Sequence, residues 1–600
     1  MGGMAPHFRW RPQICPREHG MASMNRIRLQ ADPSPGLGSL PVSSPIRFAS
    51  AIAGLALALA WLLPNHVPPW MFFLQEALVG GGFALLAASA FWGLRGRIAW
   101  RWPELLAASF VLIVTLQYLA GVIGFAQSAW MSALYLLGFV LASQTGAALE
   151  QRQPDRALSI VTVGCLLAGL LSVVLQLVQL AGLGPDDVSI WLYRGSPGRP
   201  AANLGQPNLL ATAQVIALLG AFRLWRLQRV PGVLAFLAVQ LLLLGIALTQ
   251  SRTGLLNTWI VCMLLLIWNK GDAKLRRWLV ALGLLATGLF VAYMHLGPLL
   301  SPAIDAGLAD RGSNLGTRPF AWRLFAAAIA QQPITGYGWD QTFRALLAVA
   351  PRYPQVPEIW LQTHNLLLDL AVWNGLPVAV AATGILLAWF LRCARHAADE
   401  GSRSLLLVVV VVMVHAMLEY PLTYAFVLLP FGLVAGALGE RTQATVIWRA
   451  PRWTAWALLA AAVAAMALTV RDYLRVEHSY RQLLLEKARI QVTDDRAPPD
   501  TVVLTSLRDL IVLSRLEPRS GMSAAELQWM AEVVRTHPGA YNFAKVARAL
   551  AYNGREAEAQ LWVEDLCRLF PARQCAAQAA DWADQVPGLG GVVWPRVPMR

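Results

Sequence analysis

Long apolar segments separated by short polar connections fill most of the first 470 residues of the chain. A membrane-spanning helix needs about twenty apolar residues, because each residue rises about 1.5 Å through a hydrocarbon core about 30 Å thick. Thirteen segments approach this length, at 48–63, 71–92, 104–124, 129–148, 158–181, 207–222, 231–249, 253–268, 278–296, 364–391, 404–419, 422–439 and 453–470. The pattern predicts an all-α fold, a polytopic transmembrane bundle of about 12–13 spans within residues 47–470.

The remaining segments are polar and differ in character. Residues 1–46 carry Pro, Ser, Gly and Arg without an apolar period, which predicts a disordered cytoplasmic leader. No apolar segment with a small-residue cleavage site precedes the first span, so we expect a signal anchor rather than a removed signal peptide. Residues 297–363 form the longest connection and predict a large external loop.

Residues 471–600, here called the tail, have a helical amphipathic pattern and predict a separate helical domain. Its segment ARALAYNGREAEAQLW at 547–562 is similar to one tetratricopeptide-like repeat unit, which favours a docking or packing role over catalysis. Cys567 and Cys575 lie in the tail. They could pair in an oxidising compartment, and a reduced pair is an equal alternative.

Charge gives the bundle an orientation. Only 14% of residues are charged against 56% apolar, so we attribute the net charge of +15 to cytoplasmic loops and not to nucleic-acid binding. Alternate loops are basic, with Arg95, Arg97 and Arg101; Arg152 and Arg156; Arg223, Arg226 and Arg229; Lys270, Lys274, Arg276 and Arg277; Arg392, Arg395 and Arg403; and Arg441, Arg449 and Arg452. This pattern predicts a cytoplasmic N-terminus and, after thirteen spans, a tail outside the cytoplasm.

Three external connections nevertheless carry arginine, namely 182–206, 250–252 and 297–363. Their arginines are Arg194, Arg199, Arg252, Arg311, Arg318, Arg323, Arg344 and Arg352. Arginine on the disfavoured side raises the cost of insertion, so we expect an anionic ligand at the membrane surface. The alternative is a set of salt bridges within the loops.

His364 stands where the long external loop enters a predicted span. A helix N-terminus favours anions, and an imidazole with an unperturbed pKa of about 6.5 suits proton transfer near neutrality. The sequence therefore predicts a catalytic histidine at the external surface. A helix cap or a packing residue is the alternative.

Four short motifs around this position give a resemblance to a known family. They are TQSRTGLL at 249–256, the Arg318-x-x-x-Trp322 step, the P-x-x-G-x-G turn at 333–338, and His364-Asn365 at a helix start. Because these four motifs occur in this order, the chain resembles the O-antigen ligase superfamily of bacterial membrane glycosyltransferases. The resemblance implies an active site containing His364, Arg252 and Arg318, with Arg311 competing for the role of Arg318.

Two longer signatures, GRPAANLGQPNLLA at 198–211 and HAMLEYPLTYAFVLLPFGLVAGA at 415–437, resemble the pilin-type protein O-oligosaccharyltransferases. That resemblance implies functional roles for Gln206 and Tyr420. It also implies transfer of an oligosaccharide from a polyprenyl (undecaprenyl) diphosphate carrier to Ser/Thr hydroxyls of periplasmic or pilin proteins. The enzyme would lie in the bacterial inner membrane and use no cofactor.

The chemistry of four other side chains, Gln206, Asn208, His415 and Glu419, indicates further roles. Gln206 and Asn208 flank a proline at a span start, where they could bind sugar or acceptor or simply cap the helix. His415 and Glu419 are four residues apart, so we expect an ion pair on one helix face that positions Tyr420. Two such ligands are too few for a metal site. Glu419 is accordingly grouped with the substrate-binding residues.

Three alternatives remain from the sequence. A lipopolysaccharide O-antigen ligase and a polysaccharide polymerase are sister activities in the same superfamily. A transporter, from another functional class, would predict charged or broken helices at the midplane and two related halves, and the sequence shows neither.

Overall fold

The computed structural model describes residues 44–182, 191–193, 198–300, 304, 316–490, 496–585 and 591–595. All described elements belong to one compact unit, Ser43–Arg600. Most of the predicted leader and Arg311 lie outside the described residues. The last residues assigned to the leader start the first helix instead, because α1 begins at Ser44.

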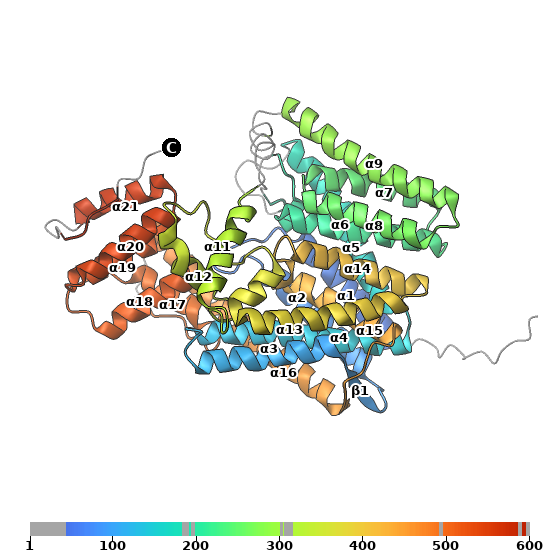
Figure 1. Ribbon diagram of the computed structural model, residues 1–600, viewed down its shortest axis with the longest axis horizontal. Helices are drawn as coiled ribbons and strands as arrows, with labels where there is room; N and C mark the ends of the chain where they lie inside the picture. Colours follow the sequence, from blue (N-terminus) through green and yellow to red (C-terminus); the bar gives the residue numbers. More distant parts are fainter. Residues whose placement is uncertain are drawn as a thin grey trace, which may run out of the picture. The chain divides into compact units, whose positions relative to one another are not determined.

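Each of the thirteen predicted spans contains a helix (Figure 1). These helices are α1 (Ser44–Leu62), α2 (Phe73–Phe91), α3 (Trp102–Leu119), α4 (Ala126–Arg152), α5 (Arg156–Leu180), α6 (Pro207–Arg226), α7 (Gly232–Leu248), α8 (Arg252–Trp268), α9 (Ala273–Leu296), α13 (Leu366–His396), α14 (Glu400–Ala416), α15 (Ala425–Arg441) and α16 (Trp453–Lys487). Within the described residues, nine helices are long and apolar enough to cross a membrane. The other four, α7, α8, α14 and α15, are each 17 residues long. The all-α membrane fold is confirmed, and the number of spans stays a prediction.

Glycines set the closest helix packing in the bundle. A Cβ on Gly146 of α4 would overlap the carbonyl oxygen of Leu433 in α15, and a Cβ on Gly436 would overlap that of Ser143. Only glycine fits at these two positions, so the two backbones lie in direct contact, as small residues allow in membrane bundles.

The basic loops gather at one end of the bundle, here called the basic end. Two short strands from two of these loops, β1 (Arg97–Trp100) and β2 (Trp448–Pro451), pair antiparallel with Arg97 opposite Pro451. Arg441 joins two further connections, the α4–α5 turn through Glu150 and Asp155 and the α13–α14 turn through Asp399, at 2.5 to 2.8 Å. The prediction that these loops share one side of the bundle agrees with these contacts.

Helix α13 is broken near its start, which the apolar pattern of the sequence does not predict. Gly375 has φ 79° and ψ 167°, outside the helical region, and Pro377 follows it. Backbone N–H groups of Tyr337 and Gly338 donate to the carbonyls of Val372 and Trp373, at 2.7 and 3.1 Å. The glycine turn at 333–338 thus bonds the backbone groups that the break would leave free, which gives this motif a structural role.

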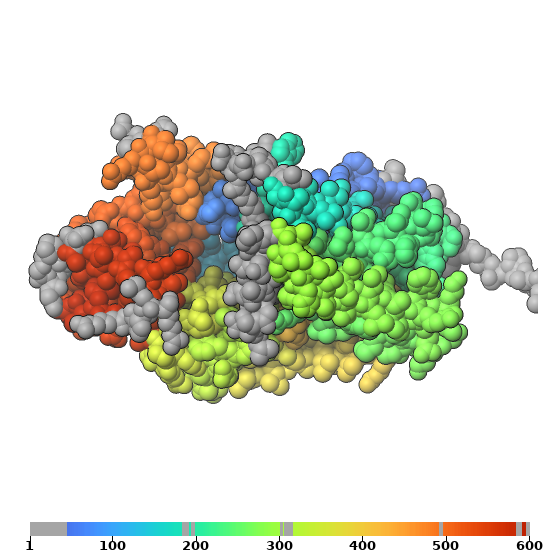
Figure 2. All heavy atoms as spheres, turned by 90° about the horizontal axis from the view of Figure 1, so that it is seen from above, coloured from blue at the N-terminus to red at the C-terminus, as the bar shows by residue number. Residues whose placement is uncertain are grey.

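The long loop contains α11 (Arg318–Gln331) and α12 (Thr342–Val349), which lie beside the tail. Arg344 of α12 forms an ion pair with Glu532, and the Val356 N–H donates to the Arg568 carbonyl at 2.9 Å. Figure 2 shows the tail, in red, against the yellow-green loop helices.

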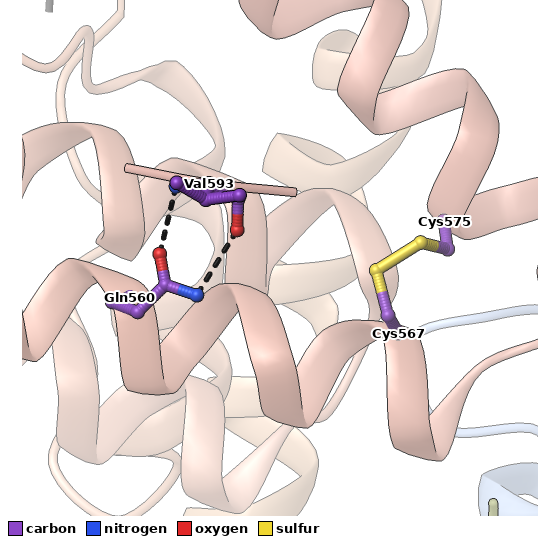
Figure 3. The surroundings of a disulfide bond; sticks show 4 residues. All are labelled: Gln560, Cys567, Cys575 and Val593. Atoms are coloured by element: carbon purple, nitrogen blue, oxygen red, sulfur yellow. Dashed lines mark hydrogen bonds between the residues drawn. A yellow bond between two sulfur atoms is a disulfide. The ribbon is translucent and has the colours of Figure 1, made fainter. Parts of the chain in front are cut away.

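The tail consists of α17 (Thr505–Arg515), α18 (Ala524–Thr536), α19 (Ala540–Tyr552), α20 (Glu556–Leu569) and α21 (Ala572–Gln585). The predicted boundary at 470/471 falls inside α16, which continues from the bundle into the tail. Cys567 and Cys575 form a disulfide between α20 and α21, and the Gln560 side chain bonds both backbone groups of Val593 (Figure 3). Of the two alternatives for these cysteines, the structure has the paired one.

Candidate active site

The candidate site lies where several helices begin, at the end of the bundle opposite the basic loops. Gln206 caps α6 by accepting from the N–H groups of Asn208 and Leu209, at 2.6 and 3.0 Å. Ser251 caps α8 and Asn365 caps α13 in the same way. Capping side chains satisfy the free N–H groups of a first turn, and the helix dipoles make such a place favourable for anions.

Glu419 is the centre of the site. It lies in the connection between α14 and α15, and it is buried. Its Oε2 is 2.7 Å from Nδ1 of His364, and its Oε1 accepts from Nδ2 of Asn208 at 2.8 Å. The same Oε1 forms an ion pair with Arg318, the first residue of α11. One carboxylate therefore connects α6, α11, α14 and the start of α13.

Asn208 extends this network to α8. Its Oδ1 accepts from the Ser251 hydroxyl at 2.8 Å and from the Arg199 guanidinium at 3.4 Å. Asn208 and Ser251 are both buried, so their positions are fixed by these bonds and by helix packing. Ser251 was not singled out from the sequence, although a serine directly before a span start has the pattern of an N-cap.

The backbone places His364 in an unusual conformation. Its φ of 59° lies in the left-handed region, which residues other than glycine rarely adopt. Neighbouring bonds hold it there, because the N–H of Thr363 donates to Asp369 at 2.7 Å and Trp322 donates to the Thr363 carbonyl at 3.1 Å. Strained backbone held by surrounding bonds is typical of functional sites.

The bond to Glu419 also decides which nitrogen of His364 can react. A carboxylate is an acceptor, so Nδ1 carries the hydrogen in this pair. In the neutral ring, Nε2 is then the basic nitrogen available to a substrate. A carboxylate that holds one ring nitrogen fixes both the tautomer and the ring orientation.

Tyr420 packs against the imidazole. The two rings meet edge to face, with centroids 4.8 Å apart, and a hydrogen bond joins the phenol to that of Tyr424. Burial and the nearby Glu419 carboxylate raise the pKa of Tyr420, so its phenol keeps its proton. Tyr420, which the resemblance implicated in function, thus lies against His364.

The expected ion pair between His415 and Glu419 is wrong. His415 bonds through Nδ1 to the Thr212 hydroxyl at 2.8 Å, whereas Glu419 pairs with Arg318 and His364. The Glu419 N–H still donates to the His415 carbonyl at 2.9 Å, so the helical spacing is present, but each side chain has other partners.

Two other predicted residues, Gln206 and Arg252, lie beside the cluster around Glu419. Gln206 caps a helix, as the alternative interpretation proposed. Arg252 is the first residue of α8, directly after Ser251, and is exposed. The structure therefore brings together His364, Arg318, Asn208, Glu419 and Tyr420, and it puts Gln206 and Arg252 next to members of that cluster.

Comparisons with known proteins match most of this chain. A family model described as O-Antigen ligase matches residues 237–383, which contain Arg252, Arg318 and His364. A second, described as the C-terminal part of a virulence factor membrane-bound polymerase, matches residues 404–585, which contain Glu419 and Tyr420.

Two curated relatives come from Acinetobacter baylyi. A general O-oligosaccharyltransferase is 29% identical over 537 residues, 86% of this chain and 92% of the relative. A ComP-specific O-oligosaccharyltransferase is 27% identical over 249 residues, 41% of this chain and 44% of the relative. The names of both relatives support a glycosyl-transferring enzyme. Together with the O-antigen ligase match and the membrane helices, they show that the chain is similar to proteins of the O-antigen ligase superfamily.

Proposed function

We propose that this protein transfers an oligosaccharide en bloc from polyprenyl (undecaprenyl) diphosphate to Ser/Thr hydroxyls of periplasmic or pilin proteins. The observation that carries the proposal is the contact of one buried carboxylate, Glu419, with both His364 and Arg318. That contact puts a possible general base beside a cation suited to a diphosphate. The names of the two relatives supply the class of reaction.

His364 is proposed as the general base. As the acceptor oxygen bonds to the anomeric carbon, its proton passes to Nε2 of His364. The bond from that carbon to the diphosphate oxygen breaks, and its electron pair leaves with the polyprenyl diphosphate. Glu419 would stabilise the imidazolium that forms. A base placed in this way typically contributes about 10² to 10⁴ in rate.

Arginines and helix N-termini are proposed to hold the diphosphate. Arg318 begins α11, Arg252 begins α8, and Arg199 bonds Asn208 beside the α6 start. A guanidinium binds phosphate oxygens in a bidentate manner and stays charged at a membrane surface. Arg318 is partly exposed, so it can reach a donor from its position on Glu419.

A polysaccharide polymerase is the second candidate, because the model matched at residues 404–585 is described as part of a membrane-bound polymerase. The two activities differ in their product. A protein ligase adds glycan mass to Ser or Thr of a protein, whereas a polymerase changes only the length of a glycan chain.

Intact-protein mass spectrometry of periplasmic and pilin proteins separates the two. In a deletion strain we expect glycan mass to disappear from those proteins, to return with the wild-type gene, and to stay absent with His364→Ala expressed at the same level. Unchanged protein masses together with altered glycan length would favour the polymerase and contradict the proposal.

A further inference from the structure

An apolar groove lies between α2, α4, α15 and α16, helices that all belong to predicted spans. The space within it, counted together with its open side, is about 870 Å³, and apolar side chains form nearly all of its walls. Small residues leave this space open, notably Ala77 and Gly80 on α2 and Gly138 on α4. The mechanism proposed above does not use the groove.

The groove has a closed end and a wide end. Near its closed end α4 and α15 touch, because a Cβ on Gly146 would overlap the Leu433 carbonyl. At Gly138, two turns earlier in α4, the nearest atom to an added Cβ is the end of the Leu429 side chain, at 3.2 Å. The space therefore widens toward the first turn of α15, where Ala425 lines it.

The single carboxylate in the wall is already bonded within the protein. Glu76 accepts from the Tyr135 hydroxyl and from the backbone N–H of Ala425. These bonds hold the start of α15 in place, and they occupy the Glu76 carboxylate. A polar ligand would find few free partners here, so the groove suits a hydrocarbon chain.

The wide end adjoins the candidate active site. Ala425 of the groove follows Tyr424, whose phenol bonds Tyr420, and the Tyr420 ring is 4.8 Å from that of His364. From there the α4 wall runs from Met131 to Thr145, about 21 Å of helix rise. A ligand with a charged head at His364 could thus lay a long apolar chain along the groove.

We propose that this groove binds the prenyl chain of the lipid donor. The inference rests on the proposed function, which puts the diphosphate of the same molecule at Arg318 and His364. Moving a prenyl chain from the surrounding lipid into the groove gives little hydrophobic driving force. The groove therefore acts mainly through packing contacts that fix where the diphosphate lies. A phospholipid acyl chain is the competing occupant.

Photo-crosslinking tests the occupant directly. The full-length chain is placed in nanodiscs of phosphatidylethanolamine and phosphatidylglycerol with undecaprenyl diphosphate that carries a diazirine in its prenyl chain. We expect labelled peptides from the lining segments of α2, α4 and α16. A phosphatidylglycerol with a diazirine in its acyl chain is the second arm, and we expect unlabelled undecaprenyl diphosphate to displace it from these segments.

Two adjacent glycines of α2 give a matched pair of variants. A Cβ on Gly80 meets Met466 at 3.1 Å in the groove, whereas a Cβ on Gly81 meets nothing within 4 Å. Gly80→Leu should lower labelling and raise the KM for the undecaprenyl donor about tenfold, or about 1.4 kcal/mol of binding, and Gly81→Leu should change neither. Should Gly80→Leu fail to fold, Ala77→Leu replaces it at the same wall.

The outcomes separate the two proposals. If the wild type transfers glycan but the prenyl probe labels other segments, or phospholipid stays in the groove, the groove assignment is wrong and the proposed function stands. Labelling of the groove without any glycan transfer would support the lipid site and contradict the proposed function. Equal KM values for Gly80→Leu and Gly81→Leu would also overturn the groove assignment.

Discussion

Glu419 joins residues that are far apart in the chain. Its partners His364, Arg318 and Asn208 are 55, 101 and 211 positions away. A buried carboxylate held by a guanidinium, an imidazole and an amide is stable only while these partners stay in place. We therefore expect the site to lose its geometry when the charge of Glu419 is removed.

Replacing Glu419 by glutamine tests its role as a positioning residue. Glu419→Gln keeps the size of the side chain but neither balances Arg318 nor stabilises a His364 imidazolium. We expect kcat for glycan transfer to fall about 10- to 100-fold, with the KM for the acceptor protein unchanged.

The matched control for that change is Glu400→Gln at the basic end, where Glu400 is half exposed and bonds Arg226. It should leave kcat at the wild-type value. A Glu419→Gln enzyme with wild-type kcat, or one in which only the KM for the acceptor changes, would contradict the positioning role of Glu419.

At this scale the sequence predicted residues that the structure brings together, but not how they pair. His364, Arg318 and Tyr420 stand in recognisable motifs, and the structure brings them together. The partner of Glu419 was predicted incorrectly because helical spacing considers only neighbours in the chain, whereas Glu419 bonds Arg318 and His364 from other segments. Pairing across distant segments depends on helix packing, which apolar periodicity does not specify.

At the scale of elements, the site depends on the break in α13. The helix begins two residues after His364, and nine residues later Gly375 interrupts it. The glycine turn at 333–338 lies in that break, and backbone hydrogen bonds run in both directions between the loop and the helix. Spans could be predicted because apolar length alone determines them, whereas a break bonded by a remote loop has no local signal except Gly and Pro.

Gly375→Ala tests the importance of the break. Its φ of 79° disfavours any side chain, and an added Cβ would overlap the Ile334 carbonyl. We expect a destabilisation on the order of 1–3 kcal/mol, measured as a lower Tm of the purified protein. Gly384→Ala in the same helix, where a Cβ meets nothing within 4 Å, should leave the Tm unchanged. Equal Tm values for the two variants would contradict this role.

At the scale of the whole molecule, the tail is bonded both to the bundle and to the long loop. Gln127, at the start of α4, caps α17 by accepting from the N–H groups of Ser506 and Leu507, at 2.8 and 3.4 Å. The ion pair of Arg344 with Glu532 adds a second connection, from α12 to α18. The tail thus supports the loop that carries Arg318, which agrees with a packing role.

The side of the membrane on which the site lies stays a prediction from charge. Reporter fusions after residues 275, 330 and 480 should report inside, outside and outside, because the first lies in the basic segment where α9 begins. A reversal at any of these positions would place the site on the wrong face for a periplasmic acceptor.

The central claim is that His364 acts on the acceptor hydroxyl in a glycan transfer from a lipid diphosphate. Its most direct test is the mass of a pilin acceptor after incubation with the purified full-length chain and an undecaprenyl diphosphate-linked oligosaccharide. The wild type and His396→Ala, a matched change at the exposed far end of α13, should add the mass of one oligosaccharide to the acceptor at equal rates. His364→Ala should be slower by about 10² to 10⁴. A His364→Ala enzyme that glycosylates the acceptor at the wild-type rate would contradict the account.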